Sequence, residues 1–122
     1  VVGIESHEGA VAAARRGATG KERYLAGDVG VLLGEVLEAA QREAAVVLLD
    51  PPAAGVCARV VDLLVAMPVG ELVYVSCDPA TQARDVKALV SGGYTLREVV
   101  PVDMFPQTAD VEVVAFLSGP RP

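Results

Sequence analysis

Short apolar runs and amphipathic segments alternate along this chain. The apolar runs predict β-strands, and they lie at residues 1–5, 24–25, 45–49, 72–75, 96–102 and 111–117. Apolar residues at the spacing of one helix face predict helices between them, at residues 7–18, 30–42, 56–66 and 79–91. Apolar strands that alternate with helices of this length predict an α/β fold, with a mostly parallel sheet covered on both faces.

The two ends of the chain refine this prediction. Only a loop separates the strands expected at residues 96–102 and 111–117, so the C-terminal strand should pair antiparallel with its neighbour. The chain opens on Val-Val-Gly-Ile-Glu, apolar from its first residue and without an initiator Met. Free termini are normally polar, so we expect this first strand to be cut from a longer protein.

Composition and charge exclude several classes of protein. The 122 residues, 52% of them hydrophobic, suffice for one domain with a single core. No apolar run approaches the ~18 residues of a membrane span. The net charge of −6 has the wrong sign for a domain that grips nucleic acid by its phosphates. Two cysteines make no disulfide framework, which favours a reducing, cytoplasmic location, and with one His they suggest no metal site.

Residues 73–79, Val-Tyr-Val-Ser-Cys-Asp-Pro, contain the clearest candidate for chemistry. A β-branched run leads into Cys77, and Pro79 follows where a helix can begin. The pattern places the thiol at the carboxyl end of a strand, where open α/β sheets bind ligands, and beside a helix N-terminus, which stabilises a thiolate. Cys77 is therefore a candidate nucleophile, and the alternative is a buried, inert cysteine. We interpret Cys57, the other cysteine, as a packing residue.

Four segments resemble the S-adenosylmethionine-dependent RNA uracil-5-methyltransferases, in that family's order. They are Val1 to Glu5, Leu48-Leu49-Asp50-Pro51-Pro52, Tyr74-Val75-Ser76-Cys77-Asp78-Pro79-Ala80-Thr81 with Ala83-Arg84-Asp85, and Asp103-Met104-Phe105-Pro106-Gln107-Thr108 running to Val111-Glu112. The Ser-Cys-x-Pro-x-Thr and Asp-Met-Phe-Pro-x-Thr patterns are quite specific. The resemblance implies a Rossmann-like methyltransferase fold, of which residues 1–122 are the C-terminal portion without the first, central strand.

The resemblance also implies a reaction, because that family makes 5-methyluridine in tRNA and ribosomal RNA. Carbon-5 of uracil is a poor nucleophile until a thiolate adds to carbon-6, so covalent catalysis divides one hard step into easier ones. The family pattern assigns the nucleophile to Cys77 and the base that removes the carbon-5 proton to Glu112. The RNA must present an unstacked uridine.

Three acids are expected to contact S-adenosylmethionine. Glu5 ends the first strand, where nucleotide-binding folds use an acid to bind ribose hydroxyls; the alternative is a solvated strand end. Asp28, after Gly27, resembles the family's adenine-contacting turn. Asp50, before two prolines, is assigned by the resemblance to the cofactor or the uracil edge; the alternative is an ordinary strand-to-turn signal.

The sequence departs from the family pattern at two positions. Ala53 stands where the family usually has Arg, which removes a cation near the site. Asp110 stands where the family commonly has His, which adds an acid two residues before Glu112. Arg84 and Asp85 either brace the Cys77 loop or form a solvated helix pair.

The family's glycine-rich cofactor turn and its N-terminal RNA-binding domain should both lie before Val1. We therefore expect weak cofactor binding by these residues alone and RNA held mainly by other domains. We also expect no contact with a membrane, and self-association through exposed strand edges. Two hypotheses remain: the catalytic C-terminal part of such an enzyme, or a non-catalytic, folded or oligomerising module that keeps the family pattern.

Overall fold

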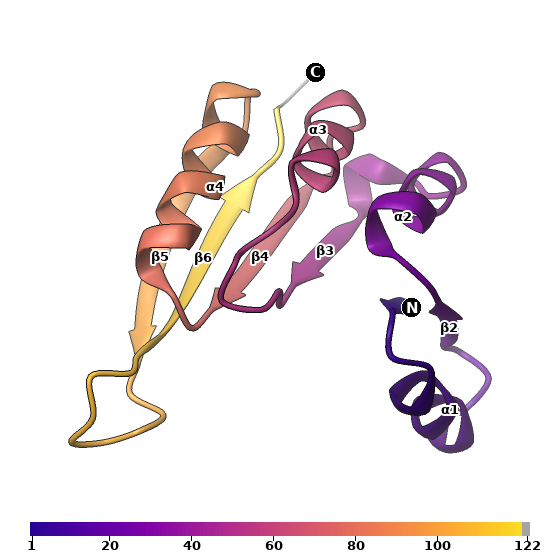
Figure 1. Ribbon diagram of the computed structural model, residues 1–122. Helices are drawn as coiled ribbons and strands as arrows, with labels where there is room; N and C mark the ends of the chain where they lie inside the picture. The colour runs from indigo at the N-terminus through magenta and orange to yellow at the C-terminus, as the bar shows by residue number, and fades with distance from the viewer. Residues whose placement is uncertain (121–122) are drawn as a thin grey trace. The chain divides into compact units, whose positions relative to one another are not determined.

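Figure 1 shows the chain as a computed structural model, which describes residues 1–120. The chain divides into two compact units, the first spanning Val1–Ala40 and the second beginning at Gln41. Each unit has its own sheet, with two strands in the first and four in the second.

The first unit is a β–α–β–α segment built around one parallel strand pair. Its elements are β1 (Val2–Glu5), α1 (Glu8–Gly17), β2 (Arg23–Ala26) and α2 (Val29–Glu38). Strands β1 and β2 are parallel and in register, so Glu5 and Ala26 end them at the same edge. His7 caps α1, because its Nδ1 accepts a hydrogen bond from the Ala10 N–H at 3.1 Å.

The second unit holds a four-stranded sheet in the order β3-β4-β6-β5. Its elements are the 3₁₀ turn η1 (Arg42–Ala44), β3 (Val46–Leu49), α3 (Ala58–Ala66), β4 (Glu71–Ser76), α4 (Pro79–Ser91), β5 (Thr95–Val102) and β6 (Glu112–Ser118). Strands β3 and β4 are parallel, whereas β6 runs antiparallel to both β4 and β5. The predicted α/β class and the antiparallel pairing of the last two strands are confirmed.

Helices α3 and α4 pack against each other on one face of this sheet (Figure 1). The connections β3–α3–β4 and β4–α4–β5 cross the sheet in the same direction, and right-handed crossovers then place both helices on the same side. Alternate residues of β4 and β6 face these helices and are buried: Leu72, Tyr74, Ser76, Val113, Ala115 and Leu117. Each fully buried leucine contributes roughly 1.5–3 kcal/mol.

The opposite face of this sheet exposes apolar side chains. Val46 and Leu48 of β3 are 63% and 67% exposed, and Phe116 of β6 is 37% exposed. No helix of residues 41–120 covers that face. The helices of residues 41–120 cover one face only, because both come from crossovers in one direction, and cover of the opposite face stays a prediction.

Hydrogen bonds from buried polar groups fix the two helices to the sheet. Gln82 Nε2 donates to the carbonyl oxygens of Tyr74 (2.8 Å) and Val113 (2.9 Å), which joins α4 to β4 and β6. The Tyr94 hydroxyl donates to the Leu64 carbonyl oxygen (3.0 Å) on α3. A buried polar group without a partner costs about 1–3 kcal/mol, so these bonds favour one placement of each helix.

Two sequence-based predictions differ from the structure. The helix predicted at residues 30–42 ends at Glu38, and Arg42 instead begins the separate 3₁₀ turn η1. Cys57 is the N-cap of α3 and its side chain is exposed, so the interpretation as a packing residue is wrong. Within residues 1–120, no helix combines the length and apolar character needed to cross a membrane.

Candidate functional site

Three of the predicted site residues lie at one end of the sheet in the second unit. Asp50 follows β3, Cys77 follows β4, and Glu112 begins β6. Ser76 pairs with Val113 in the antiparallel ladder, so Cys77 and Glu112 occupy the next position along it. Because β3 runs parallel to β4, Asp50 lies at this same edge. The topology therefore brings a thiol and two carboxylates to the carboxyl edge of the parallel strands.

The turn that carries Cys77 is fixed by the residues beside it. Ser76 Oγ accepts a hydrogen bond from the Asp78 N–H (3.1 Å) and donates one to the Asp78 carbonyl oxygen (3.0 Å). Asp78 caps α4, since its Oδ1 accepts from the N–H groups of Ala80 and Thr81, both at 2.9 Å. The bond from the Thr81 N–H is the main cause that lowers the pKa of Asp78.

Cys77 itself is exposed in front of the N-terminus of α4. The alternative of a buried, inert cysteine is therefore wrong. Cys77 stands between the last residue of β4 and Asp78, the N-cap of α4.

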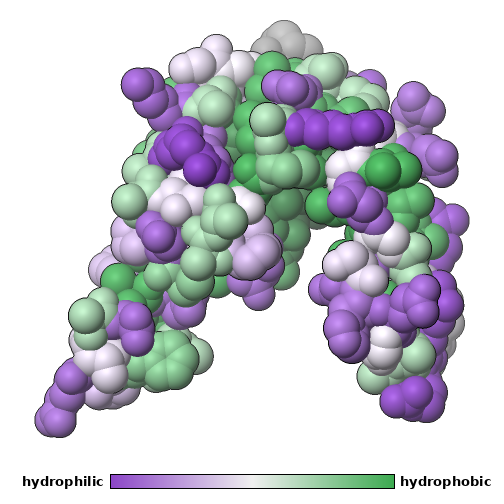
Figure 2. Space-filling view, viewed as in Figure 1, coloured by the Kyte–Doolittle hydropathy of each residue, from purple (hydrophilic) through white to green (hydrophobic). Residues whose placement is uncertain are grey.

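Glu112 is half-buried and pairs with Val102 at the end of β5. The loop between them exposes Met104 (59%) and Phe105 (53%), and Figure 2 shows hydrophobic residues on this loop at the lower left. Thr108 Oγ1 donates to the Phe105 carbonyl oxygen at 2.7 Å, which closes the turn. An exposed apolar pair therefore lies in the loop that leads to the candidate base.

The segment after Asp50 is tied to helix α4. The Asp85 side chain is buried, and its Oδ2 accepts a hydrogen bond from the Val56 N–H at 2.8 Å. Arg84 donates from Nη2 to the Ala54 carbonyl oxygen (3.0 Å) and pairs with Asp85 Oδ1 (2.8 Å). Asp85 is buried rather than solvated, and the segment that the pair braces is the one after Asp50 rather than the predicted Cys77 loop.

In the first unit, Glu5 and Asp28 lie at the carboxyl edge of the parallel pair. The Gly27 N–H donates to the Glu5 carbonyl oxygen at 3.0 Å, which joins the two turns. Glu5 Oε1 accepts from the His7 N–H (2.7 Å) and the Ser6 hydroxyl (3.2 Å), and these bonds, the first most strongly, lower the pKa of Glu5. Asp28 is exposed at the start of α2 and makes no capping bond. Both carboxylates can accept hydrogen bonds from a ligand.

The structure thus groups the predicted residues as Glu5 with Asp28 in one unit, and Asp50 with Cys77 and Glu112 in the other. Sequence reasoning missed Tyr74, whose hydroxyl donates to Asp85 Oδ2 at 2.7 Å. A tyrosine in a buried strand needs a partner for its hydroxyl, which is the signal that the sequence offered.

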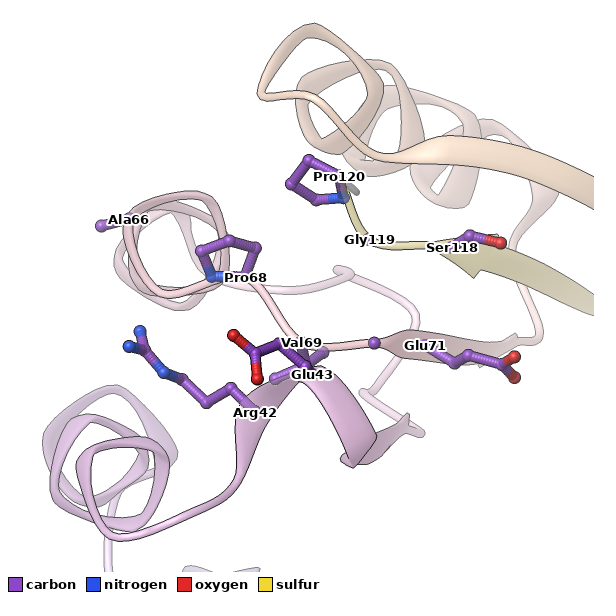
Figure 3. Close-up of a pocket in the computed structure, with 10 residues that line it drawn as sticks. Arg42, Glu43, Ala66, Pro68, Val69, Glu71, Ser118, Gly119 and Pro120 are labelled. Carbon is purple, nitrogen blue, oxygen red and sulfur yellow. The ribbon is translucent and has the colours of Figure 1, made fainter. Parts of the chain in front are cut away.

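A hollow of about 570 Å³ lies at the opposite end of the second unit's sheet. Figure 3 shows that it is lined from the segments around the start of β3, the start of β4 and the end of β6; Arg42 and Glu43 reach toward Pro68 there. None of the predicted site residues lines this hollow. The predicted site at the carboxyl edge is therefore separate from this hollow.

Comparison with protein families gives one match that covers most of the chain. The family model described as tRNA (uracil-5-)-methyltransferase matches residues 33–119. An uncharacterised RNA methyltransferase of Gloeobacter violaceus is 49% identical over 122 residues, covering 96% of this chain and 25% of its own length. One of Nitratidesulfovibrio vulgaris is 43% identical, covering 98% of this chain and 26% of its own length. The chain thus spans about a quarter of these curated relatives.

Two solved structures share the fold. The Pyrococcus abyssi tRNA (uracil-54, C5)-methyltransferase, solved with S-adenosyl-L-homocysteine, matches with a TM-score of 0.78 and 38% identity. The match covers 96% of this chain and 28% of that one. A methyltransferase structure from Thermoplasma acidophilum matches with a TM-score of 0.70 at 14% identity, covering 98% of this chain and 56% of that one, which supports the fold alone. The predicted Rossmann-like methyltransferase fold is confirmed.

Proposed function

Since the chain belongs to the tRNA (uracil-5-)-methyltransferase family, we propose that it is the C-terminal portion of an RNA methyltransferase domain. The reaction is transfer of a methyl group from S-adenosylmethionine to carbon-5 of a uridine in tRNA or ribosomal RNA. One observation carries the proposal. The exposed Cys77, just before helix α4, and the carboxylate-bearing Glu112 occupy the position next to the last residue pair of strands β4 and β6.

The chemistry assigns a role to each of these two groups. The Cys77 thiolate adds to carbon-6 of the uracil, and the electron pair of the 5,6 double bond moves onto the carbonyl at carbon-4 as an enolate. S-adenosylmethionine, when bound, supplies the methyl group that carbon-5 takes. Glu112 then removes the carbon-5 proton, the 5,6 double bond forms again, and the thiolate leaves.

The position of Cys77 supports the first step. A nucleophilic cysteine acts as a thiolate, and Cys77 immediately precedes the N-cap of α4 at the carboxyl end of β4. The hydrogen bonds between Ser76 Oγ and the Asp78 backbone fix the turn that carries the cysteine. Its exposure gives an unstacked uridine access to it.

The three acids predicted to contact the cofactor fit hydroxyl and amine groups of an adenosyl moiety. Within residues 1–120, the hydrogen bonds to the Glu5 side chain go to Oε1, which leaves Oε2 to accept from ribose hydroxyls. The bond from the His7 N–H favours the ionised form of Glu5. Asp28 and Asp50 are exposed at strand ends and add two further acceptors.

RNA binding is proposed to depend mainly on residues beyond this chain. The net charge of −6 opposes contact with phosphates, and the curated relatives are about four times as long. We place the RNA-binding domain and the glycine-rich cofactor turn in the remaining part. The alternative, a non-catalytic module, is motivated by Ala53 and Asp110, which depart from the family pattern.

Covalent trapping distinguishes these alternatives. The full-length protein that carries this chain is incubated with S-adenosylmethionine and tRNA or ribosomal RNA that contains 5-fluorouridine. Fluorine cannot leave as a proton, so the enzyme should stall as a protein–RNA adduct, and Cys77→Ala should form none. Cys57→Ala is the matched control, because it removes the other exposed thiol and should leave the adduct in place.

A second variant tests the base. Glu112→Gln should accumulate the adduct on ordinary uridine, because the thiolate cannot leave until the carbon-5 proton is removed. If wild-type protein forms no adduct on either RNA while it still binds S-adenosylhomocysteine, the enzyme proposal is wrong and the non-catalytic module is favoured.

A further inference from the structure

The buried carboxylate of Asp85 joins three segments that meet near the candidate site. Its side chain is only 4% exposed. Oδ2 accepts hydrogen bonds from the Tyr74 hydroxyl (2.7 Å) and the Val56 N–H (2.8 Å), and Oδ1 accepts from Arg84 Nε (2.8 Å). Burying a carboxylate is costly without partners, and here three donors compensate that cost.

Each of the three segments that Asp85 joins has a place in the proposed reaction. Tyr74 lies on β4, three residues before Cys77. Val56 ends the loop that Asp50 begins. Asp85 itself lies on α4, two turns beyond the start of the helix in front of the cysteine. One side chain therefore fixes the Asp50 loop relative to both the strand and the helix that carry the thiol.

The Arg84 side chain adds a second connection between the same loop and α4. Its Nη2 donates to the carbonyl oxygen of Ala54 at 3.0 Å, while the guanidinium stays paired with Asp85. This connection is at the surface, because the Arg84 side chain is 61% exposed. The loop is thus held from the buried side by Asp85 and from the solvent side by Arg84.

The hydroxyl of Tyr74 is a reliable donor in this arrangement. Burial is the main cause that raises the pKa of Tyr74, and the hydrogen bond to Asp85 adds to it. The hydroxyl therefore keeps its proton at neutral pH and donates a hydrogen bond to the carboxylate. A phenylalanine at this position would fill the same space but would leave Oδ2 with one donor fewer.

We infer that Asp85 is a positioning residue for methyl transfer, which holds the Asp50 loop at the correct place relative to Cys77. The inference rests on the proposed function. Asp85 contacts none of the reacting groups and acts through the loop and the strand that it joins. Displacing a substrate-contacting loop by about 1 Å can cost about 10²-fold in rate, so loss of this carboxylate should slow the reaction without unfolding the protein.

The test compares Asp85→Asn with wild type in the full-length protein that carries this chain. The rate of adduct formation on RNA with 5-fluorouridine should fall by about 10- to 100-fold at saturating S-adenosylmethionine. The RNA concentration that gives half the maximal rate should stay within about twofold, because RNA is held elsewhere. Rates are divided by the fraction of protein that binds S-adenosylhomocysteine, which separates positioning from loss of folded protein. Asp62→Asn, which removes an exposed carboxylate of α3, is the matched control and should react like wild type.

If Asp85→Asn fails to fold, a variant of a surface residue tests the same inference. Arg84→Met removes the bond to Ala54 from an exposed side chain, and it should slow adduct formation by about 3- to 10-fold with the same half-saturating RNA concentration. If Asp85→Asn reacts at the wild-type rate, or if it fails to fold and Arg84→Met reacts at the wild-type rate, the inference is wrong while the proposed function stands. If wild type itself forms no adduct, the proposed function fails and the inference fails with it.

Discussion

Gly55 combines two constraints at a single residue of the second unit. Its φ of +83° lies in the left-handed region, which side chains other than glycine rarely adopt. An added Cβ would also contact Asp85 Oδ2 and Thr81 Cγ2, and it would lie 2.7 Å from Arg84 Nη2. The loop therefore approaches α4 closely because residue 55 has no side chain.

Gly55→Ala should lower the free energy of unfolding of the second unit by more than the left-handed backbone strain alone would. Left-handed strain costs about 1–3 kcal/mol, and the contacts with Asp85 and Thr81 should add overpacking of about 1–3 kcal/mol. Gly93→Ala is the matched control: its φ is +108°, but the nearest atom to its Cβ is 3.7 Å away. Urea unfolding of both variants measures the difference, and equal losses would mean that the Asp85 carboxylate moves aside freely.

The position of Cys77 between β4 and α4 could be predicted from the sequence, whereas the network around Asp85 could not. Cys77, its preceding strand and its following helix are contiguous, so local pattern was enough. The Asp85 carboxylate instead meets Tyr74 and Val56, which are 11 and 29 residues away along the chain. Periodicity and turn chemistry contain no information on which of many loops will contact a given helix face.

At the scale of elements, α4 depends on its first turn. Asp78 is the N-cap, and Pro79 occupies the first helical position, where its missing N–H costs no bond. Asp78 Oδ1 accepts from two of the N–H groups that a helix start leaves open. The same turn presents Cys77, so the stability of this cap and the placement of the thiol are linked.

Asp78→Ala should loosen the first turn of α4, and Asp78→Asn should preserve most of it, because the amide oxygen can still accept both bonds. The expected result is faster hydrogen exchange at Ala80 and Thr81 in the alanine variant only. The folded-state pKa of Asp78 is lowered, chiefly by the bond from the Thr81 N–H. Its charge therefore stabilises the fold above its ordinary value of 3.8, and that stabilisation is lost as pH falls through the folded-state value.

Unfolding at pH 7 and pH 3 checks the sign. Wild type should lose more stability on acidification than Asp78→Asn, which has no charge to lose. Equal acid sensitivity in the two proteins would contradict the assignment of this cap to the ionised carboxylate.

The order and type of the elements could be predicted from the sequence, because the spacing of apolar residues differs clearly between its strands and its helices. The α4 helix was predicted with its observed bounds, since Pro79 and the Gly92-Gly93 pair mark its two ends. The face on which α3 and α4 pack was not predicted, because cover depends on the direction of successive crossovers and not on the pattern of any one segment.

At the scale of the whole molecule, the two edge strands of the second unit's sheet differ in how they are protected. Strand β5 carries Arg97, Glu98 and Pro101 and is interrupted by a bulge between residues 96 and 98. These features oppose pairing with another chain. Strand β3 has the sequence Val-Val-Leu-Leu, with neither a charge nor a proline, and Val46 is 63% exposed. An unprotected apolar edge of this kind is a site for strand pairing between copies.

We therefore predict that the isolated 122-residue chain self-associates through β3, and that Val46→Lys reduces the association. A lysine on an edge strand opposes pairing because its charge would be buried between the two chains. Val31→Lys is the matched control, since Val31 is a 57% exposed valine on helix α2 rather than on a strand. Sedimentation velocity over a range of concentrations measures the assembly. If both substitutions reduce the association equally, the association is due to general surface hydrophobicity and not to β3. If the isolated chain associates but the full-length protein does not, other residues of the full-length protein cover β3.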